Sequence, residues 1–487
     1  MLNTKLKIQA TVTLLLLAAI GNGPGLCVGQ PPGAEAQVPG LIRSARSGPW
    51  SEANTWEGGK LPPALSRVQI RTGHTVSYDM KSDRVIRSIH VAGTLRFSPD
   101  KDTRLDVGLI KIQPGDDASE DGFDCDAHAM EPPAGQPRPA LEVGTPDRPI
   151  DVGRTTLIRL THVNGLDKLS CPAIVCCGGR MDFHGTPSSR SWVRLGATAK
   201  KGESVVTLAE PVTGWKVGDR VIVTPTKLTY SKTSSTEERT IKAIDGAKLT
   251  LNQPLDVDHR ADGLYTGEVA NLSRNVIVES ADPNGERGHT MYHRHSAGSI
   301  SYAEFRHLGK KDMLGRYAIH FHLVRDTMRG SSVIGASIWD SHNRWLTIHG
   351  TDYLVVRDCV GYQSIGHGFF MEDATEQYNV LDRNLAVQAN RGKRLPKQVL
   401  PFDDNDGAGF WWATAAIPSH ATSPATTLTT ATSSTSPPTA WTCRCGCPTA
   451  RSSAATCVPS PSSASRIMKP TRCASTASSS APTARAD

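Results

Sequence analysis

Short runs of alternating apolar and polar residues, separated by turn-forming residues, recur along most of the chain. In the N-terminal part, these runs are residues 68–70, 75–78, 85–91 and 94–97, with Gly-Gly, Pro-Pro, Thr-Gly and Ala-Gly pairs around them. Alternation with a period of two places successive side chains on opposite faces of a strand. Runs this short between turn signals predict an all-β fold.

Similar segments recur farther along the chain at a spacing of about one coil. They begin at Ser332 (SVIGASIWDS), Leu354 (LVVRDCVGYQS) and Asn379 (NVLDRNLAVQA). An internal period of this kind marks a β-solenoid. A second set of predicted strands lies between them, at residues 318–322, 345–350, 368–373 and 409–413. The pattern therefore predicts stacked β coils over residues 271–412.

The segment RYAIHFHLVRD, residues 316–326, places two histidines two residues apart in an apolar run. On a strand, His320 and His322 leave the backbone on one face, and Ile319, Phe321 and Leu323 leave it on the other. The two imidazoles are therefore expected to point the same way.

Stacking the second set of strands as successive rungs brings further polar residues into line with this pair. In that alignment, His320, His349 and either Glu372 or Asp373 fall at nearly the same coil position. A slip of one residue would move each side chain to the opposite face.

The N-terminus has the composition of an export signal. Lys5 and Lys7 precede the apolar run of residues 8–20, and the small residues 34–36 (AEA) follow. This order is typical of a secretory signal peptide, so residues 1–36 are expected to be a signal and short linker; an uncleaved anchor is the alternative. No later stretch approaches the ~18 apolar residues of a membrane span. We expect a protein that is secreted, at the cell surface or periplasmic, with no membrane span after cleavage.

The net charge of +7 is confined to the two ends of the chain. Residues 413–487 contain six basic residues and one acidic residue, and Lys5 and Lys7 supply the rest, so residues 30–412 are neutral. A neutral body offers no global attraction to polyanions, and we expect no nucleic-acid partner. An anionic substrate would have to meet a local cluster, such as Arg391, Lys393 and Arg394.

The cysteines of the body suggest one disulfide. Cys171 lies close in sequence to Cys176 and Cys177, and it could pair with either after export. Cys359 lies in a strand-like run and is expected to be a buried apolar residue.

Residues 413–487 break the β pattern. They are rich in Ala, Ser, Thr and Pro, with one aromatic residue, Trp441, and no Glu. Such a segment buries too little apolar surface to order itself, so it is expected to be a disordered, low-complexity tail. It is either the product of a shifted reading frame or a Ser/Thr/Pro stalk.

The N-terminal strands carry motifs that resemble a known family. The matching residues are Trp50, Trp56-Glu57-Gly58-Gly59, Pro62, Val68-x-Ile70, Gly73-x-Thr75-Val76, Asp79 and Val91-x-Gly93-Thr94-Leu95. In order, they resemble a G8 domain, here residues 45–165, with a β-rich connecting region at 166–270. Over residues 45–412 the chain resembles the family of the cell migration-inducing and hyaluronan-binding protein and transmembrane protein 2.

This resemblance implies a right-handed parallel β-helix after the G8 domain and a hyaluronan-like extracellular polysaccharide as partner. It also includes the segments IHFH, TIHG, GHGFFMED and the pair Trp411-Trp412. The expected function is binding or depolymerisation of the polysaccharide, as a hydrolase or a lyase. The alternative is a non-catalytic glycan-binding or adhesion module.

The candidate catalytic residues follow from the chemistry of glycan cleavage. Hydrolysis needs a pair of carboxyl groups, and elimination needs a base and a cation that neutralises the uronate. The candidates are His320, His322, His349, His367, Glu372 and Asp373. The histidines could equally bind a metal, or be stacked residues satisfied by neighbouring coils.

Two other groups have candidate binding roles. Trp411 and Trp412 are expected to stack on sugars or to be core residues, and the basic cluster at 391–394 is a candidate substrate contact. Calcium is a candidate ligand of Asp79 and the acidic segment, but the spacing of that segment is not that of an EF-hand, and a solvated loop is the alternative. Its aspartates are Asp116, Asp117, Asp121, Asp124 and Asp126.

Overall fold

The computed structural model describes residues 40–116, 118–123, 135, 137–226, 235–262, 265–398, 400–413 and 430–431. The predicted signal peptide lies outside these residues, as does nearly all of the predicted disordered tail. Among the described residues, the only helices are the 3-10 turns η1 (Ala53–Thr55) and η2 (Glu57–Gly59). No helix in this part of the chain is long and apolar enough to cross a membrane.

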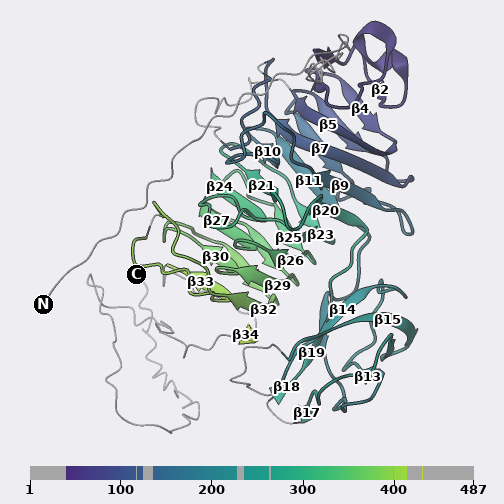
Figure 1. Cartoon of the computed structure of the whole chain (residues 1–487), viewed down its shortest axis with the longest axis vertical. Coiled ribbons are helices and arrows are strands. Elements are labelled where there is room, and N and C mark those ends of the chain that lie inside the picture. The colour runs from purple at the N-terminus through teal and green to yellow at the C-terminus, as the bar shows by residue number, and fades with distance from the viewer. Residues whose placement is uncertain are drawn as a thin grey trace, which may run out of the picture. The chain divides into compact units, whose positions relative to one another are not determined.

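The fold is a parallel β-helix, as predicted, in which strands one coil apart pair side by side (Figure 1). Three ladders of parallel strands form three faces of the solenoid. The first face consists of β1 (Leu41–Arg43), β3 (Arg67–Ile70), β5 (Lys81–Val91), β7 (Thr103–Ile112), β10 (Ala173–Cys176), β21 (His289–Tyr292), β24 (Ile319–Arg325), β27 (Leu346–Thr351), β30 (Phe369–Met371) and β33 (Phe410–Trp412).

The second face begins beside the N-terminal half of β7, which pairs with β9. Its strands are β9 (Thr156–Leu160), β20 (Val276–Ser280), β23 (Ala303–Arg306), β26 (Ser337–Ser341), β29 (Val360–Ile365), β32 (Leu385–Asn390) and β34 (Thr430–Ala431). The third face consists of β2 (Gly48–Pro49), β4 (Thr75–Tyr78), β6 (Thr94–Phe97), β8 (Ala140–Val143), β11 (Arg180–His184), β22 (Ile300–Ser301), β25 (Ser332–Ile334), β28 (Val355–Arg357) and β31 (Val380–Asp382).

The internal period read from the sequence is confirmed. The segments that begin at Ser332, Leu354 and Asn379 contain the strand pairs β25–β26, β28–β29 and β31–β32. Ser337 pairs with Val360 and Ile319 with Leu346, so these two coils take 23 and 27 residues.

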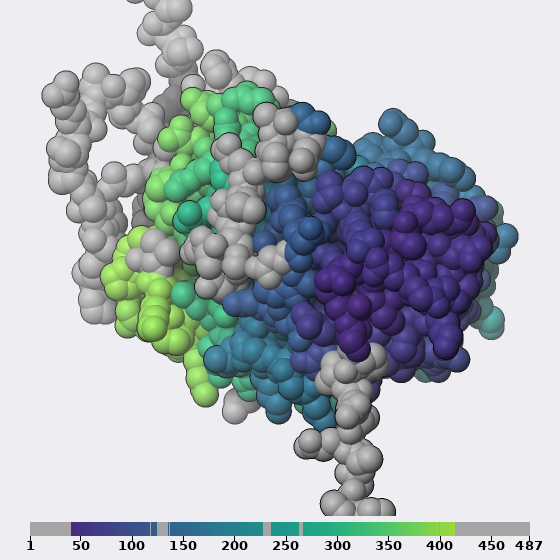
Figure 2. Space-filling view, turned by 90° about the horizontal axis from the view of Figure 1, so that it is seen from above, coloured from purple at the N-terminus to yellow at the C-terminus, as the bar shows by residue number. Residues whose placement is uncertain are grey.

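The N-terminal strands share one ladder with the later coils. β10 pairs with β7 on one side and with β21 on the other. The ladder therefore continues without interruption past residue 165, where the G8 domain is expected to end. Figure 2 looks onto the end where the first of these coils lies, in purple. The coils enclose a continuous apolar core, which includes Trp56 and Phe321.

Trp50 and Trp56 are core residues of the first coil. They are 3% and 1% exposed, and their ring centroids lie 4.6 Å apart at an edge-to-face angle. Trp56 Nε1–H donates a hydrogen bond to the carbonyl oxygen of Trp50. The first coil is therefore anchored by two buried aromatic residues.

An antiparallel domain is inserted in the connecting region, between β11 on the third face and β20 on the second. It has its own apolar core, which includes Val221 and Leu249. Its sheet contains β12 (Trp192–Arg194), β13 (Val205–Thr207), β14 (Arg220–Val223), β15 (Glu237–Asp245), β16 (Lys248–Leu251) and β19 (Glu268–Asn271), with a two-stranded hairpin of β17 (Ala261–Asp262) and β18 (Tyr265–Thr266).

The inserted domain packs on the second face. Trp192 Nε1–H donates a hydrogen bond to the carbonyl oxygen of Arg383, and the Tyr362 hydroxyl donates one to Glu238. Trp192 and Trp339 belong to the same buried cluster.

The predicted pairing of Cys171 is wrong. Cys171 and Cys176 are buried free thiols, whereas Cys177 is disulfide-bonded. Cys359 is a buried free thiol, as expected. Burial raises the pKa of Cys171 to about 11 and those of Cys176 and Cys359 to about 12, so these thiols are unreactive.

Candidate functional site

Three histidines and a glutamate lie at one register position in successive coils of the first face. His322 pairs with His349, and Met291 pairs with His320, so His293 comes next to His322. The Glu372 amide donates to the Ile348 carbonyl, which brings Glu372 beside His349. We call His293, His322, His349 and Glu372 the histidine row.

The row lies on the outer side of the strands, because the residues that alternate with it enter the core. Tyr292, Phe321 and Ile348 are all core residues. The predicted face of His320 and His322 is therefore confirmed. The predicted alignment is displaced by two residues, since His322 and not His320 stands in register with His349, and a displacement of two keeps the face unchanged.

Leu323 does not follow Ile319 and Phe321 into the core as predicted. Its φ is +54°, and the pairing of β24 with β27 shifts register between His322 and Arg325. This β-bulge turns Val324 inward instead, where it is 1% exposed.

Contacts along the row are short. The Nδ1 atoms of His322 and His349 lie 3.0 Å apart, and the rings of His293 and His322 lie 4.9 Å apart. His349 Nδ1 is 3.7 Å from Glu372 Oε2, and its Nε2 is 3.4 Å from Asp373 Oδ2. The structure thus brings together four of the predicted site residues: His322, His349, Glu372 and Asp373.

His320 joins this group from the neighbouring register position. Its ring centroid lies 4.9 Å from that of His322 and 6.2 Å from that of His349. Its Nδ1 is 2.9 Å from the carbonyl oxygen of Gly315. Its Nε2 is buried and has no hydrogen-bond partner.

The loop that supplies this carbonyl requires glycine. Gly315 has a φ of +79°, and a Cβ atom there would lie 2.7 Å from the ring of Phe123. Arg316 stacks on Phe123, with its guanidinium carbon 3.3 Å from the ring centroid. The carbonyl that orients His320 is therefore held in place from two sides.

Burial keeps the central imidazoles neutral. Burial, and then the neighbouring His349, lowers the pKa of His322 to about 2, and burial lowers the pKa of His320 well below its ordinary value. Burial and a hydrogen bond with Asp373 raise the pKa of Glu376 to about 7. Glu376, which sequence reasoning missed, is therefore a carboxyl group that can hold a proton near neutral pH.

A buried arginine that sequence reasoning also missed closes the end of the row. Arg344 is completely buried, and its Nη1 lies 2.9 Å from the Tyr317 hydroxyl and 3.5 Å from Glu372 Oε1. Its Nη2 lies 3.0 Å from Asp403 Oδ2. Its sequence context, SHNRWLTIHG, gave no sign of burial, because arginine is seldom buried without partners that come from elsewhere in the chain.

His367 does not join the histidine row. Its Nε2–H donates to Asp403 at 2.8 Å, and its Nδ1 accepts a hydrogen bond from the Ala408 amide. Both ring nitrogens are thus used to hold residues 403–408 against the coils. Its ring contacts Phe370 and Trp411.

The side chains of the two tryptophans of β33, Trp411 and Trp412, point to opposite sides of the strand. Trp411 pairs with Phe370 and stacks on it with centroids 4.3 Å apart, while Trp412 pairs with Met371, which packs against the core. Alternation therefore places Trp411 on the outer side and Trp412 on the core side. Both side chains are half-buried.

The basic cluster lies on the loop between β32 and β33. Arg391 pairs with Asp406, Lys393 pairs with Asp312, and Arg394 donates to the carbonyl oxygen of Pro401. The side chains of Arg391 and Lys393 are 61% and 79% exposed, so they remain accessible to an anionic partner.

The residues considered for calcium have other partners. Asp79 accepts hydrogen bonds from Ser51 and Lys101, and Asp121 accepts one from the Phe123 amide. Asp116 lies 3.4 Å from the Gln69 amide, while Asp117, Asp124 and Asp126 lie outside the described residues. In the part of the chain that is described, the group with metal-ligand spacing is His320, His322 and His349.

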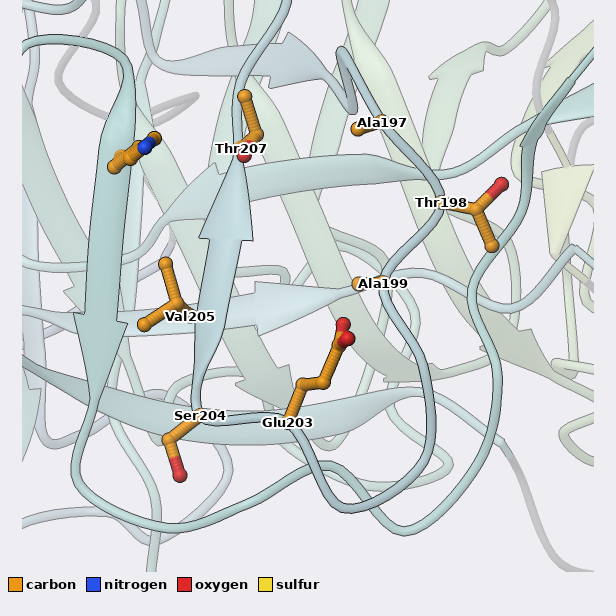
Figure 3. Close-up of a pocket in the computed structure, with 8 residues that line it drawn as sticks. Ala197, Thr198, Ala199, Glu203, Ser204, Val205 and Thr207 are labelled. Carbon is orange, nitrogen blue, oxygen red and sulfur yellow. The ribbon is translucent and has the colours of Figure 1, made fainter.

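A pocket of about 440 Å³ lies in the inserted domain (Figure 3). It is lined by residues of β13 and the preceding loop, including Thr198 and Glu203, and by Lys248. Glu203 accepts a hydrogen bond from the Lys200 amide. The lining contains no histidine or cysteine.

Two family models match the chain. The G8 domain matches residues 55–196, and the CEMIP beta-helix matches residues 286–402. Together they cover just over half of the 487 residues and leave out most of the inserted domain. The second match contains the whole histidine row.

Similar proteins support these matches. Human Fibrocystin-L is 29% identical over 417 residues, covering 74% of this chain and 9% of that protein. Human cell surface hyaluronidase CEMIP2 is 30% identical over 218 residues, covering 39% of this chain and 16% of that protein. The chain spans less than a fifth of the length of either relative.

Among solved structures, the tailspike protein gp49 of Pseudomonas phage LKA1 matches with a TM-score of 0.22 and 10% identity. The matched region covers 66% of this chain and 49% of the tailspike chain, and a similarity at this level supports no argument. The two family matches, together with the ladder of parallel coils, show that this chain contains a G8 domain and a β-helix that matches the CEMIP beta-helix model.

Proposed function

We propose that this chain is an exported carbohydrate-active protein that binds and depolymerises a hyaluronan-like extracellular polysaccharide on the outer side of the first face. The observation that carries the proposal is the alignment of His322, His349 and Glu372 in successive coils, with Asp373 beside them. Coils stacked along one axis present such groups as a line, and an extended polymer can lie along that line. The relative named as a cell surface hyaluronidase supports the substrate class.

The chemistry of either cleavage reaction can draw on this group. Hydrolysis would use two carboxyl groups, one of them protonated, and Glu376 beside Asp373 is suited to hold that proton. Elimination would use His349 as base, with a cation to neutralise the uronate. Arg391 and Lys393 would contact the polymer where it passes the exposed loop.

The competing function is a glycan-binding module without catalysis. It is favoured by the burial of Glu372, whose side chain is 5% exposed and pairs with Arg344. A carboxylate with this partner has a structural role that needs no substrate.

Incubation with high-molecular-mass hyaluronan separates the two functions. We expect a loss of viscosity together with new chain ends, which are reducing ends for a hydrolase and unsaturated uronates for a lyase. H349Q should abolish cleavage, whereas H342Q, a histidine beyond the end of β26, should retain it. Retained binding with unchanged polymer length would establish the module instead.

A further inference from the structure

Three imidazoles converge on one point on the outer side of the first face. His320, His322 and His349 each offer one ring nitrogen, and these atoms lie within 4.8 Å of one another. Zinc–nitrogen bonds are about 2.0–2.1 Å long, so two ligands of a tetrahedral ion lie roughly 3.3–3.4 Å apart. The 3.0 Å between the Nδ1 atoms of His322 and His349 is close to this spacing.

In His320 and His349, the ring nitrogen that points away from this site faces an oxygen acceptor and carries the proton. The other ring nitrogen therefore keeps its lone pair and points toward the site. His320 donates its Nδ1–H to the Gly315 carbonyl, which leaves Nε2 as the unprotonated nitrogen. His349 Nε2 faces Asp373 at 3.4 Å, which leaves its Nδ1 unprotonated. Carbonyl and carboxylate partners of this kind orient the histidine ligands of metal sites.

Two buried atoms beside the point have no hydrogen-bond partner. His320 is 1% exposed, and its Nε2 has none. Glu372 is 4% exposed, and its Oε2, 3.7 Å from His349 Nδ1, also has none. Buried polar atoms are nearly always hydrogen-bonded, so two such atoms at one place indicate a missing ligand.

We infer that His320, His322 and His349 bind one divalent transition-metal ion of the zinc class through Nε2, Nδ1 and Nδ1, with the fourth position open beside Glu372. Three imidazoles suit zinc and its neighbours in the first transition series, whereas calcium and magnesium prefer oxygen ligands. The site requires His322 to carry its proton on Nε2, which leaves the ring neutral. The inference does not rest on the proposed function, although a metal-bound His349 could not also serve as the base of an elimination.

The test is direct titration of the full-length protein with Zn²⁺ after removal of metals by a chelator. Wild-type protein should bind one equivalent by calorimetry, and excess Ca²⁺ should not displace it. Replacing the zinc by Co²⁺ should give the intense visible absorption of a tetrahedral ion. H342Q is the matched control, because it removes a half-buried histidine outside the cluster, and it should bind zinc as wild type does.

The ligand variants define the site. H322Q and H349Q should lose at least about 100-fold in zinc affinity, and D373N, which alters only an orienting carboxylate, about 10-fold. Circular dichroism checks that each variant is folded, and D373N carries the test if a ligand variant is not. A folded wild type that binds less than about a tenth of an equivalent, or a folded D373N and H322Q that bind like H342Q, would overturn the inference.

Discussion

Two columns of polar residues run along this β-helix, and they are built in opposite ways. On the second face, Asp106, Arg159, Glu279 and Arg306 occupy one register position in successive coils, so opposite charges alternate. Arg159 and Arg306 lie 2.8 and 2.7 Å from the two oxygens of Glu279. On the first face, the equivalent column repeats one group, imidazole, in three coils.

The difference shows what coil stacking demands of its polar residues. Opposite charges alternate in the second-face column and form ion pairs with one another, so most of its charge is compensated within the chain. Neutral imidazoles satisfy one another only in part: Glu372 Oε2 in the first-face column has no hydrogen-bond partner, and neither has Nε2 of the neighbouring His320. Each column occupies one register position in successive coils. The residue types at that position decide whether the column stabilises the fold or binds a ligand.

The largest effect on stability is expected at Arg344, which pairs with Glu372 at the end of the histidine row. R344M should lower the free energy of unfolding by about 3–5 kcal/mol, because it leaves the buried carboxylates of Glu372 and Asp403 without their cation. Urea unfolding followed by circular dichroism measures this loss. A change below about 1 kcal/mol would show that the row ends in something other than an ion pair.

Removing the central charge of the second-face column should have the next largest effect. E279A leaves Arg159 and Arg306 without their shared partner and should cost about 2–3 kcal/mol. Hyaluronan cleavage and zinc binding should be unchanged, since the column belongs to another face. Loss of either property in a folded E279A would contradict the separation of roles.

The pH dependence of stability should report a histidine that lies outside both columns. Burial lowers the pKa of His289 to about 3, so the unfolded chain binds its proton at a higher pH than the folded chain does. The contribution of His289 to stability is therefore complete above about pH 6.5 and is lost as the pH falls toward 3, by up to about 1.4 kcal/mol per pH unit.

The matched variant is H289Q, which keeps a donor for the Ser170 carbonyl. Its unfolding free energy should diverge from that of wild type only below about pH 6.5. There, the slope of its unfolding free energy against pH should correspond to about one proton fewer taken up on unfolding. Parallel curves down to pH 4 would mean that His289 does not titrate in this way.

The smallest effect on stability is expected within the histidine row. H322Q should change the free energy of unfolding by about 1 kcal/mol or less, because it removes one shared hydrogen bond, yet it should abolish cleavage and zinc binding. Thermal unfolding in a chelator separates the contribution of the fold from that of the ion. A loss of several kcal/mol with cleavage intact would make the row a structural column like that of the second face.

The coils could be predicted from the sequence because their signals are local. The alternation around Ile319 and Phe321, and the recurrence of segments from Ser332, are set by neighbouring residues, and both reappear as strands. The register between coils is not local: it depends on loop lengths, and paired residues are 23 apart at Ser337–Val360, 27 apart at Ile319–Leu346 and 41 apart at Phe369–Phe410. That variation accounts for the displacement of His322 relative to the predicted alignment.

Partners from distant segments escaped prediction for the same reason. The burial of Arg344 depends on Asp403, which lies 59 residues away in sequence, and His367 is held by residues of that same loop. The direction of the inserted strands also escaped, because alternation alone does not distinguish antiparallel from parallel pairing. The bulge at Leu323 follows from a positive φ that few non-glycine residues adopt.

The inserted domain also affects how the chain reaches its fold. Thr156 of β9 pairs with Val276 of β20, so this contact closes a loop of roughly 120 residues instead of one coil. Closure entropy grows only with the logarithm of loop length, at about 0.6 kcal/mol per doubling, so the native state is weakened by little more than 1 kcal/mol. The rate is affected more, since non-local pairing slows folding. The coils before and after the insertion are expected to form early as two separate units, and the joining of β9 to β20 then sets the pace at which one solenoid is completed.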